Sequence, residues 1–561
     1  MNVLGLSYNY HDAAASVVRD GVPIAAAEEE RFSRLKHDLS FPDRAIAYCL
    51  HEAGISAAEL DAVAFYEKPA RKLERALQIG KQYALVSIEN VAAQFPTLII
   101  QGMGAEDTVR DKLGFRGPVF FCEHHGSHAA SAFYLSPFEE ASILTVDGVG
   151  EWATCAEFTG QGSSIEKRRE IYYPHSIGLF YSTLTAFLGF RVNDDEYKIM
   201  GLASYGKPCY RREFDKLIEI HGDGSFTLAL EYFAYMYDSE KMYSTQMEGL
   251  LGKPRRNHEP IEERHMDIAS SLQEVTEEVM VAMARSCRSN TASANLCLAG
   301  GVAYNCVANS KIVERSGFER VFIQPAAGDS GGAIGAALWA SHEILNEPRY
   351  PIHFNPLLGP SFTEDQILNR LHAFEMKYIR LEEEDLCRRV AKLIHNNLIL
   401  GWFQGRMEFG PRALGSRSIL ANPCAANMKD ILNARVKFRE EFRPFAPAVT
   451  EEASPTYFEL EGASPFMLQT PRVRPDKAAQ IPSVTHVDGT ARVQTVSATG
   501  NPLFHRLIEC FGDLSGVPIL INTSFNIRGE PIVCTPDDAI KCFMGTDIDF
   551  LAIGPFLVSK D

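Results

Sequence analysis

The 561-residue chain has few of the features that mark exported or membrane-embedded proteins. It has no uninterrupted run of about 18 apolar residues, so we expect no membrane-spanning helix. Its N-terminus, MNVLGLSYNYHDAAASVV, has no basic region followed by an apolar run, so we expect no signal peptide. The 12 cysteines include no CxxC pair, and we expect them to be reduced thiols in a cytoplasmic protein.

The chain also lacks an excess of basic side chains. Its formal net charge of -17 argues against broad binding to a phosphate backbone, so we expect no nucleic-acid partner, although a local basic pocket remains possible. A length of 561 residues is too great for one ordinary core and predicts two or three domains.

Histidine, by contrast, is concentrated in one short stretch, FFCEHHGSHAASAF, which holds His124, His125 and His128. On a helix, His124 and His128 would share one face because they are four residues apart. Two imidazoles on one face can bind a metal, but they can equally lie in a core or on a surface. Neighbouring Cys122 is interpreted as a core residue.

The first part of the chain alternates between strand and turn patterns. VLGLSY predicts a strand, and AASVVRDGVPIAAAEE predicts two strands joined through Asp20-Gly21. PDRAIAYCLHEAG predicts a helix with Pro42 near its start and Gly54 at its end. DAVAFYE predicts another strand, and residues 70 to 115 have a mostly helical pattern.

The strand–turn–strand pattern then returns in ASILTVDGVGEWATCAEFTG, with a glycine-rich turn around Asp147. Two such hairpins suggest a duplicated α/β fold that holds a nucleotide between its halves. Two more glycine-rich turns follow, at Gly300-Gly301 and in QPAAGDSGGAIGAALWA. Glycine lets backbone approach a ligand closely, and a helix N-terminus favours anionic groups, but tight packing alone would also explain either turn.

A proline-rich stretch, NEPRYPIHFNPLLGPSFTEDQI, predicts a domain boundary near residue 355. Beyond it, GRMEFGPRALGSRSILANP and NARVKFREEFRPFAPAV interleave arginines with Gly, Pro and Phe. This pattern suits a shaped pocket better than a helix surface, and the planar fork of arginine suits bidentate phosphate binding. DGTARVQTV and LINTSFNIRGEPIV add further donors, so the second domain is predicted to bind a small, highly charged phosphate compound.

Together these segments resemble the NodU/CmcH family of O-carbamoyltransferases. The resemblance covers essentially the whole chain, and it is carried in order by HDAAASVV, EEERFSRLKH, EHHGSHAASAF, TVDGVGEWAT, EYKIMGLASYG, LAGGVAYNC, GDSGGAIGAAL, FGPRALGSRSIL, FRPFAPAV and NTSFNIRGEPIV. It implies an α/β protein with a duplicated ASKHA domain (actin-like, Hsp70-like, TsaD-like) over residues 1–355. A YrdC-like α/β domain would cover residues 356–561.

The resemblance also implies the reaction. Carbamoyl phosphate is activated with ATP, accompanied by Mg(II), to carbamoyl adenylate in the YrdC-like domain, and pyrophosphate is released. The carbamoyl group then passes to a hydroxyl of a small-molecule natural product in the TsaD-like domain. There a metal, with Fe(II) expected first and Zn(II) or Mn(II) as alternatives, is held by His124, His128, Asp147 and Asp329, while His125 is no ligand.

By the same resemblance, His11 acts as general base, Asp12 orients it or contacts the acceptor, and Lys36 stabilises the adenylate phosphate. A purely structural histidine and a surface lysine are the alternatives for His11 and Lys36. The implied pocket for carbamoyl phosphate and ATP consists of Arg412, Lys437, Arg443, Arg492, Asn522 and Ser524, followed by Arg528, Arg417 and Arg406. The implied contacts to adenosine, phosphate or acceptor in the first domain are Gly300, Gly301, Asn305, Lys198 and Gly201.

Other functions stay open at this point. The two domain types also fit an enzyme that makes threonylcarbamoyl-adenosine in tRNA, although the acidic balance weighs against it. An ASKHA small-molecule kinase or a nucleotide-binding regulator would leave the basic pocket without a purpose. The aromatic segment within residues 205 to 265 is a candidate acceptor pocket or ordinary core, and a homodimer is possible.

Overall fold

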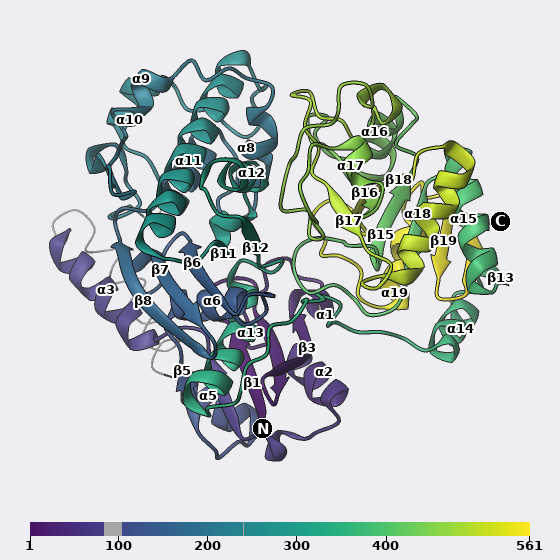
Figure 1. Ribbon diagram of the computed structural model, residues 1–561, viewed down its shortest axis with the longest axis horizontal. Helices are drawn as coiled ribbons and strands as arrows, with labels where there is room; N and C mark the ends of the chain where they lie inside the picture. The colour runs from purple at the N-terminus through teal and green to yellow at the C-terminus, as the bar shows by residue number, and fades with distance from the viewer. Residues whose placement is uncertain (84–103, 239, 561) are drawn as a thin grey trace. The chain divides into compact units, whose positions relative to one another are not determined.

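The computed structural model describes residues 1–83, 104–238 and 240–560 and divides the chain into two compact units (Figure 1). The first unit holds Met1–Ala26 and Leu39–Phe354, and the second holds Ala27–Asp38 and Asn355–Asp561. The proline-rich stretch thus contains one crossing between the units. The expected division at residue 355 had assigned residues 27–38 to the first domain, whereas the structure places them in the second.

The first unit contains two five-stranded sheets that share the same topology. The first has the order β3 (Val22–Glu28), β2 (Ala14–Arg19), β1 (Asn2–Ser7), β4 (Ala62–Phe65) and β5 (Val119–Phe121). The second has the order β8 (Ser164–Tyr172), β7 (Ala153–Gln161), β6 (Glu140–Val146), β11 (Asn295–Ala299) and β12 (Arg320–Ile323). In both, an antiparallel hairpin is followed by two strands parallel to its first strand. The hairpin echo in the sequence therefore reflects two sheets of the same design.

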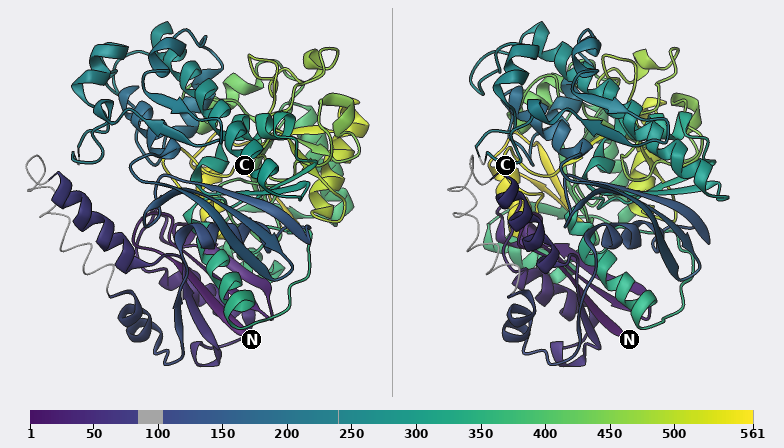
Figure 2. Two further views of the ribbon diagram at one scale, coloured as in Figure 1. Left: turned by 60° about the vertical axis from the view of Figure 1, so that its left-hand side comes forward. Right: turned by 90° about the vertical axis from the view of Figure 1, so that its left-hand side faces the viewer.

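Two helices lie between these sheets (Figures 1 and 2). α13 (Asp329–Trp339) packs on β1, β2 and β4, while α6 (His124–Phe133) packs on β6, β7 and β11, and the two helices pack on each other. A Cβ atom at Gly335 would collide with the carbonyl oxygen of Ser127 in α6, and one at Gly5 with that of Ala333 in α13. The small residues of α13 therefore serve close helix and strand packing.

Several expected elements are present where the sequence placed them. The turn between β2 and β3 has positive φ at both Asp20 and Gly21, as a tight hairpin requires. The helix α2 (Asp43–Ala53) begins after Pro42 and ends at Gly54, whose φ is 65°. Of the stretch expected to be mostly helical, α3 (Pro69–Gln82) and α5 (Ala105–Leu113) are helices, and residues 84–103 lie outside the described residues.

The remaining helices and strands of the first unit include the long helix α11 (Glu263–Asn290), on which several of the others pack. These elements are α7 (Ile177–Phe187), α8 (Glu196–Ala203), α9 (Arg211–Phe214), β9 (Ile218–Ile220), β10 (Phe226–Leu228), α10 (Thr245–Leu251), α11 and α12 (Cys306–Arg315). Among the described residues, none of the helices combines the length and the apolar character needed to cross a membrane.

The second unit is built on one mixed eight-stranded sheet. Its order is β13 (Lys377–Arg380), β20 (Phe556–Ser559), β19 (Phe550–Ile553), β14 (Leu400–Phe403), β15 (Arg417–Ala421), β18 (Ile519–Ser524), β16 (Ala446–Thr450) and β17 (Gln494–Val496). Successive strand residues point to opposite faces, so Trp402 and Phe403 enter different cores. On one face lie α15 (Glu383–His395) and α18 (Pro502–Ser515). The other core includes α14 (Glu364–Ala373), α16 (Met428–Leu432), α17 (Ser454–Tyr457) and α19 (Pro536–Met544).

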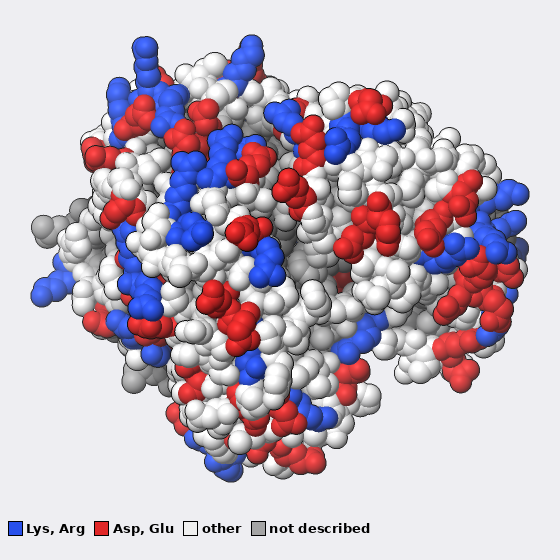
Figure 3. All heavy atoms as spheres, viewed as in Figure 1, with Lys and Arg blue, Asp and Glu red and all other residues white. Residues whose placement is uncertain are grey.

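The two units carry charges of both signs on their surfaces. On the face drawn in Figure 3, lysines and arginines alternate with aspartates and glutamates over each unit. The helix α15 begins with three acidic residues in its first turn, where negative charge favours the helix dipole. The net charge of -17 is therefore carried by mixed surfaces.

Candidate functional site: a histidine–aspartate cluster and a basic pocket

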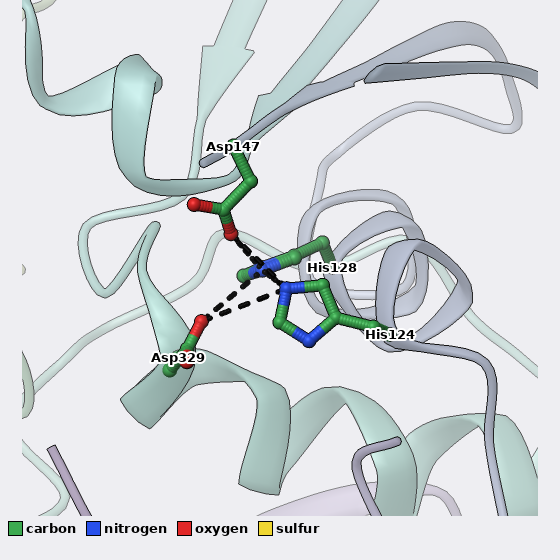
Figure 4. A group of neighbouring side chains, drawn as sticks. All are labelled: His124, His128, Asp147 and Asp329. Carbon is green, nitrogen blue, oxygen red and sulfur yellow. Dashed lines mark hydrogen bonds and ion pairs between the residues drawn. The ribbon is translucent and has the colours of Figure 1, made fainter. Parts of the chain in front are cut away.

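Four side chains from three elements of the first unit converge on one point (Figure 4). His124 and His128 come from successive turns of α6, Asp147 follows the end of β6, and Asp329 is the first residue of α13. Their ligand atoms all lie within 4.8 Å of one another. The HxxxH spacing thus places both imidazoles on one helix face, as the sequence predicted.

The geometry of the cluster centres on one carboxylate oxygen. Asp147 Oδ2 lies 3.1 Å from His124 Nε2 and 2.9 Å from His128 Nε2, and these two nitrogens lie 3.1 Å apart. Asp329 Oδ1 lies 3.7 Å from each of the same nitrogens. Two nitrogens and two oxygens therefore face one small volume.

The donor set fits a divalent transition metal. His128 is fully buried and His124 and Asp329 are 3% exposed, so these polar groups are largely cut off from water. Within the described part of the chain, both Nδ1 atoms and Asp329 Oδ2 lack a hydrogen-bond partner. Buried imidazole and carboxylate groups that share one focus are satisfied by a cation, and this mixed nitrogen and oxygen set suits Fe(II), Zn(II) or Mn(II).

The pKa shifts of the cluster residues also favour a bound cation. Burial favours the neutral forms, but hydrogen bonds to Asp147 and Asp329 outweigh it and raise the pKa of His128 to about 9. Although burial raises the pKa of Asp147, its hydrogen bonds to His124 and His128 outweigh that effect and hold the pKa well below its ordinary value. The two carboxylates thus stay ionised, and positive charge placed between them stabilises the cluster.

Surrounding groups hold α6 in place. Glu151 accepts the backbone N–H groups of His124 at 3.0 Å and of Lys68 at 2.7 Å, which puts a negative charge at the N-terminus of α6. His125 points away from the cluster. Its Nε2 donates to Ala153 O at 3.0 Å, its Nδ1 lies 2.7 Å from Thr145 Oγ1, and burial lowers its pKa to about 3. The structure thus places His125 as a neutral core histidine.

The turn between β1 and β2 brings His11 to the edge of the cluster. His11 Nδ1 lies 2.9 Å from Asp12 Oδ2, and His11 Nε2 lies 4.0 Å from Asp329 Oδ2. Burial lowers the pKa of His11, but the charge of Asp329 and the hydrogen bond to Asp12 outweigh it and raise the pKa to about 9. His11 is 27% exposed, so it is open to solvent beside the buried set.

Other predicted residues of the first unit lie in structural contacts. Gly300 has a φ of 91°, and a Cβ there would collide with Val146 O, so this turn packs against the strand that carries Asp147. Asn305 caps α12 by accepting the Ala308 N–H at 3.0 Å, and its amide pairs with that of Gln273. Lys198 forms a 2.7 Å ion pair with Asp195. Their proposed ligand contacts remain predictions.

Lys36, expected beside the adenylate in the first domain, lies instead in the second unit. It belongs to Ala27–Asp38 and is exposed just after the short helix α1 (Glu30–Ser33). Its role remains a prediction. The sequence carried no signal for this placement, because the segment is bounded by ordinary strand and loop patterns.

In the second unit, Lys437 is buried among oxygen atoms. It lies at the end of a π-helical turn, Asn433–Lys437, and its Nζ donates to Asn526 Oδ1 at 2.9 Å and to Ser524 Oγ at 3.3 Å. These acceptors are neutral. Burial, with the charges of Arg439 and Arg443 adding to it, lowers the pKa of Lys437 well below its ordinary value. A phosphate anion here would supply the missing negative charge.

Arg412 lies on a loop next to β18. Its Nε is buried and, within the described residues, has no hydrogen-bond partner. The same loop contacts Asn522, whose Nδ2 donates to Ala413 O at 3.1 Å and to Gln494 Oε1 at 2.7 Å. The Oδ1 of Asn522 is buried and also lacks a partner among the described residues. These groups leave hydrogen-bonding capacity for a ligand.

Two of the three arginines placed last in the implied pocket donate to backbone carbonyl oxygens. Arg417 is fully buried, donates to the carbonyl oxygens of Gln404 at 2.9 Å and Pro360 at 2.8 Å, and stacks on Phe403. Arg406 donates to Leu358 O at 2.7 Å. These contacts hold the two side chains in place, and their proposed ligand contacts remain predictions. Sequence alone could not distinguish them from Arg412.

The remaining arginines are more loosely held. Arg443 lies 3.8 Å from Glu440, and exposed Arg528 lies 3.5 Å from the same carboxylate. The structure also places His486, a residue that was not predicted from the sequence, near Arg492. Burial and the charges of Arg492 and Lys429 lower its pKa to about 4, so it is a neutral neighbour of Arg492. Its position six residues before Arg492 in THVDGTAR was the available signal.

Comparison with known proteins shows the family of the chain. Family models described as carbamoyltransferase N-terminus and carbamoyltransferase C-terminus match residues 2–338 and 391–560. The chain belongs to the carbamoyltransferase family. It is an enzyme of the transferase class with relatives of NodU/CmcH type.

Three relatives illustrate the range of the family. An uncharacterized protein of Synechocystis sp. is 44% identical, covering 100% of this chain and 97% of that protein. Nodulation protein NolNO of Sinorhizobium fredii is 39% identical over 98% of this chain and 79% of its own length. The 3′-hydroxymethylcephem-O-carbamoyltransferase of Streptomyces clavuligerus is 33% identical over 52% of this chain and 54% of its own length.

A solved structure is also similar at a low level. Component A of the (R)-2-hydroxyglutaryl-CoA dehydratase of Acidaminococcus fermentans is 14% identical, with a TM-score of 0.33 over 61% of this chain and 98% of that one. A likeness of this size carries no argument about the site.

Replacing His128 with alanine tests the cluster as a metal site. The purified His128→Ala protein is expected to retain at least about tenfold less divalent metal than the wild type, because one of two imidazole ligands is lost. His125→Gln, on the same helix and equally buried, is the matched control and should keep its metal. Elemental analysis by plasma mass spectrometry measures both, and equal metal content in the two variants would contradict the assignment.

The low pKa of His486 predicts an acid-sensitive second unit. The unfolded chain binds a proton at this histidine below about pH 6.5, whereas the folded chain binds it only below about 4, so stability falls as the pH falls through this window. His486→Gln should therefore lose less stability than the wild type between about pH 7 and pH 4.5. Urea unfolding measures the loss, with the exposed His395→Gln as control, and parallel pH profiles for wild type and His486→Gln would refute the prediction.

Proposed function

We propose that this enzyme is an ATP-dependent O-carbamoyltransferase that divides its reaction between two sites. The basic pocket of the second unit activates carbamoyl phosphate with ATP, and the histidine–aspartate cluster of the first unit is the place of transfer to a hydroxyl. The proposal is supported by the family, and by the relative named for O-carbamoyl transfer to a hydroxymethylcephem. We extend the acceptor to small-molecule natural products that carry a hydroxyl.

The activation half-reaction consumes one water molecule. Carbamoyl phosphate gives up its phosphate, the resulting carbamate oxygen attacks the α-phosphorus of ATP, and the bond to pyrophosphate breaks. The products are carbamoyl adenylate, pyrophosphate and phosphate, and Mg(II) accompanies the nucleotide. Arg412 offers a cationic donor whose buried Nε has no hydrogen-bond partner among the described residues, Lys437 lies among neutral oxygens, and Asn522 offers an amide oxygen to the carbamoyl NH₂ group.

The observation that carries the transfer half-reaction is the position of His11. Asp12 holds the Nδ1–H of His11 at 2.9 Å, so the Nε2 atom that lies 4.0 Å from Asp329 is the one free to take a proton. His11 is thus placed to deprotonate the acceptor hydroxyl as it attacks the carbamoyl carbon, while AMP leaves. Asp12 fixes the tautomer and stabilises the imidazolium that results.

His124, His128, Asp147 and Asp329 would hold the divalent metal, with Fe(II) proposed first and Zn(II) or Mn(II) as alternatives. When bound, the metal would supply a Lewis acid for the carbamoyl oxygen and a template for the adenylate. Burial lowers the pKa of His11, but the charge of Asp329, the hydrogen bond and charge of Asp12 and the charge of Asp147 outweigh it and raise the pKa to about 9. A metal bound at Asp329 would offset part of this negative charge and would favour the neutral form of His11, which is the form that accepts a proton.

The division of labour predicts that the two sites are separable by mutation. With ATP, Mg(II) and carbamoyl phosphate but no acceptor, Arg412→Ala should form carbamoyl adenylate and pyrophosphate about a hundredfold more slowly than wild type, because it loses a phosphate donor. His11→Asn should form both at the wild-type rate. Arg388→Ala, an exposed arginine of the same unit, is the control. Mass spectrometry detects the adenylate.

Two results would contradict the proposal. If ATP were converted to ADP with a phosphorylated product, the enzyme would be a kinase. If His11→Asn and Arg412→Ala lost adenylate formation equally, the assignment of activation to the second unit alone would be wrong.

A further inference from the structure

A segment from the N-terminal part of the chain is built into the second unit beside the Arg412 loop. It is Ala27–Asp38, which contains the end of β3 and the helix α1. Phe32 packs against a small apolar cluster formed by Met407, Ala413, Ile532 and Cys534. The chain leads into this segment from the first unit and returns to the first unit after it, so the segment is tethered at both ends.

Arg31 is the central polar side chain of this segment. It is 4% exposed, its Nε donates to Glu28 Oε2 at 2.6 Å, and its Nη1 lies 3.2 Å from Glu30 Oε1. Burial lowers the pKa of Arg31, but the charges of Glu28 and Glu30 outweigh that effect and raise it further above its ordinary value. The guanidinium is therefore held in one fixed orientation by two carboxylates.

The Nη2 atom of Arg31, which also pairs with Glu28, reaches the loop that carries Arg412. Arg31 Nη2 donates to Gly410 O at 2.9 Å, two residues before Arg412. Gly410 has a φ of 117°, a backbone conformation that other residues rarely adopt. The N-terminal segment thus holds the loop at Gly410, before Arg412 in the sequence.

After Arg412, the same loop is held by the side chain of Glu408. Glu408 Oε1 accepts the backbone N–H groups of Leu414 and Ser416 at 2.7 Å each, and that of Arg417 at 3.2 Å. Arg412 lies between the two anchors, at Gly410 and at Leu414. Its own Nε has no partner among the described residues, so its direction depends on the backbone that bears it.

We propose that Arg31 is a positioning residue for Arg412, and that the N-terminal segment thereby completes the phosphate pocket of the second unit. The assignment to a phosphate pocket rests on the proposed function. In this arrangement Arg31 touches no substrate. It fixes the Gly410 carbonyl, and through it the direction in which the Arg412 guanidinium meets the anion.

A double-mutant cycle tests this role. Arg31→Met is expected to lower kcat/KM for carbamoyl phosphate in adenylate formation by about tenfold or more, mainly through KM. In an Arg412→Ala background the same change should cost less than about twofold, because the group that Arg31 positions is gone. Equal losses in both backgrounds would show that Arg31 acts only through general stability, and would overturn the proposal.

Arg34→Met is the matched control. Arg34 lies in the same segment and donates to Ile532 O at 2.6 Å, to Pro531 O at 2.7 Å and to Arg31 O at 3.4 Å, and among the described residues it makes no hydrogen bond to the Arg412 loop. It should leave the dependence on carbamoyl phosphate within about twofold of wild type. Because Arg31→Met leaves two buried carboxylates without their partner, the cycle is repeated with Glu28→Gln added, which keeps the fold testable.

Hydrogen exchange separates failure of this proposal from failure of the proposed function. If the wild type makes no adenylate, the proposed function fails, but exchange of the loop amides still reports on positioning. Arg31→Met should speed exchange at Arg412 to Arg417 by at least about tenfold, while Arg34→Met should not. Unchanged exchange in this loop in Arg31→Met would overturn the proposal in either case.

Discussion

The first unit depends on one arrangement: two imidazole nitrogens that share a single aspartate oxygen in its interior. Asp147 Oδ2 lies within 3.1 Å of both His124 Nε2 and His128 Nε2. The two histidines project from α6, which packs on the second sheet and on α13, and Asp147 follows β6 of that sheet. Burying this many polar groups is costly unless positive charge joins them. The glycines that let α13 approach α6 and β1, and the carboxylate that caps α6, keep the four groups converged.

The second unit meets the opposite electrostatic demand. Lys437 is buried among neutral oxygens, and burial with the charges of Arg439 and Arg443 lowers its pKa. In the first unit two carboxylates lie beside two buried imidazoles, whereas in the second a buried lysine donates to neutral oxygens. In the function proposed above, an acid anhydride is made at a phosphate-binding site in the second unit and opened beside a Lewis acid in the first, so the reaction would use both kinds of site.

Much of this could be predicted from sequence because the signals are local. The spacing of His124 and His128 predicted a shared helix face, and Asp20-Gly21 and Gly54 predicted a turn and a helix end that the structure contains. The placement of Ala27–Asp38 could not be predicted, because it depends on contacts between residues almost 400 positions apart, such as Arg31 with Gly410. Arg417 and Arg412 look alike in sequence, and only burial against carbonyl oxygens distinguishes them.

The claim that the histidine–aspartate cluster is a metal centre is tested most directly by X-ray absorption spectroscopy on the protein loaded with one equivalent of Fe(II), and in parallel with Zn(II). The account predicts two imidazole nitrogens at about 2.0–2.2 Å together with carboxylate oxygens, and loss of one imidazole in His128→Ala. A bound metal without imidazole ligands, or an unchanged spectrum in His128→Ala, would contradict it.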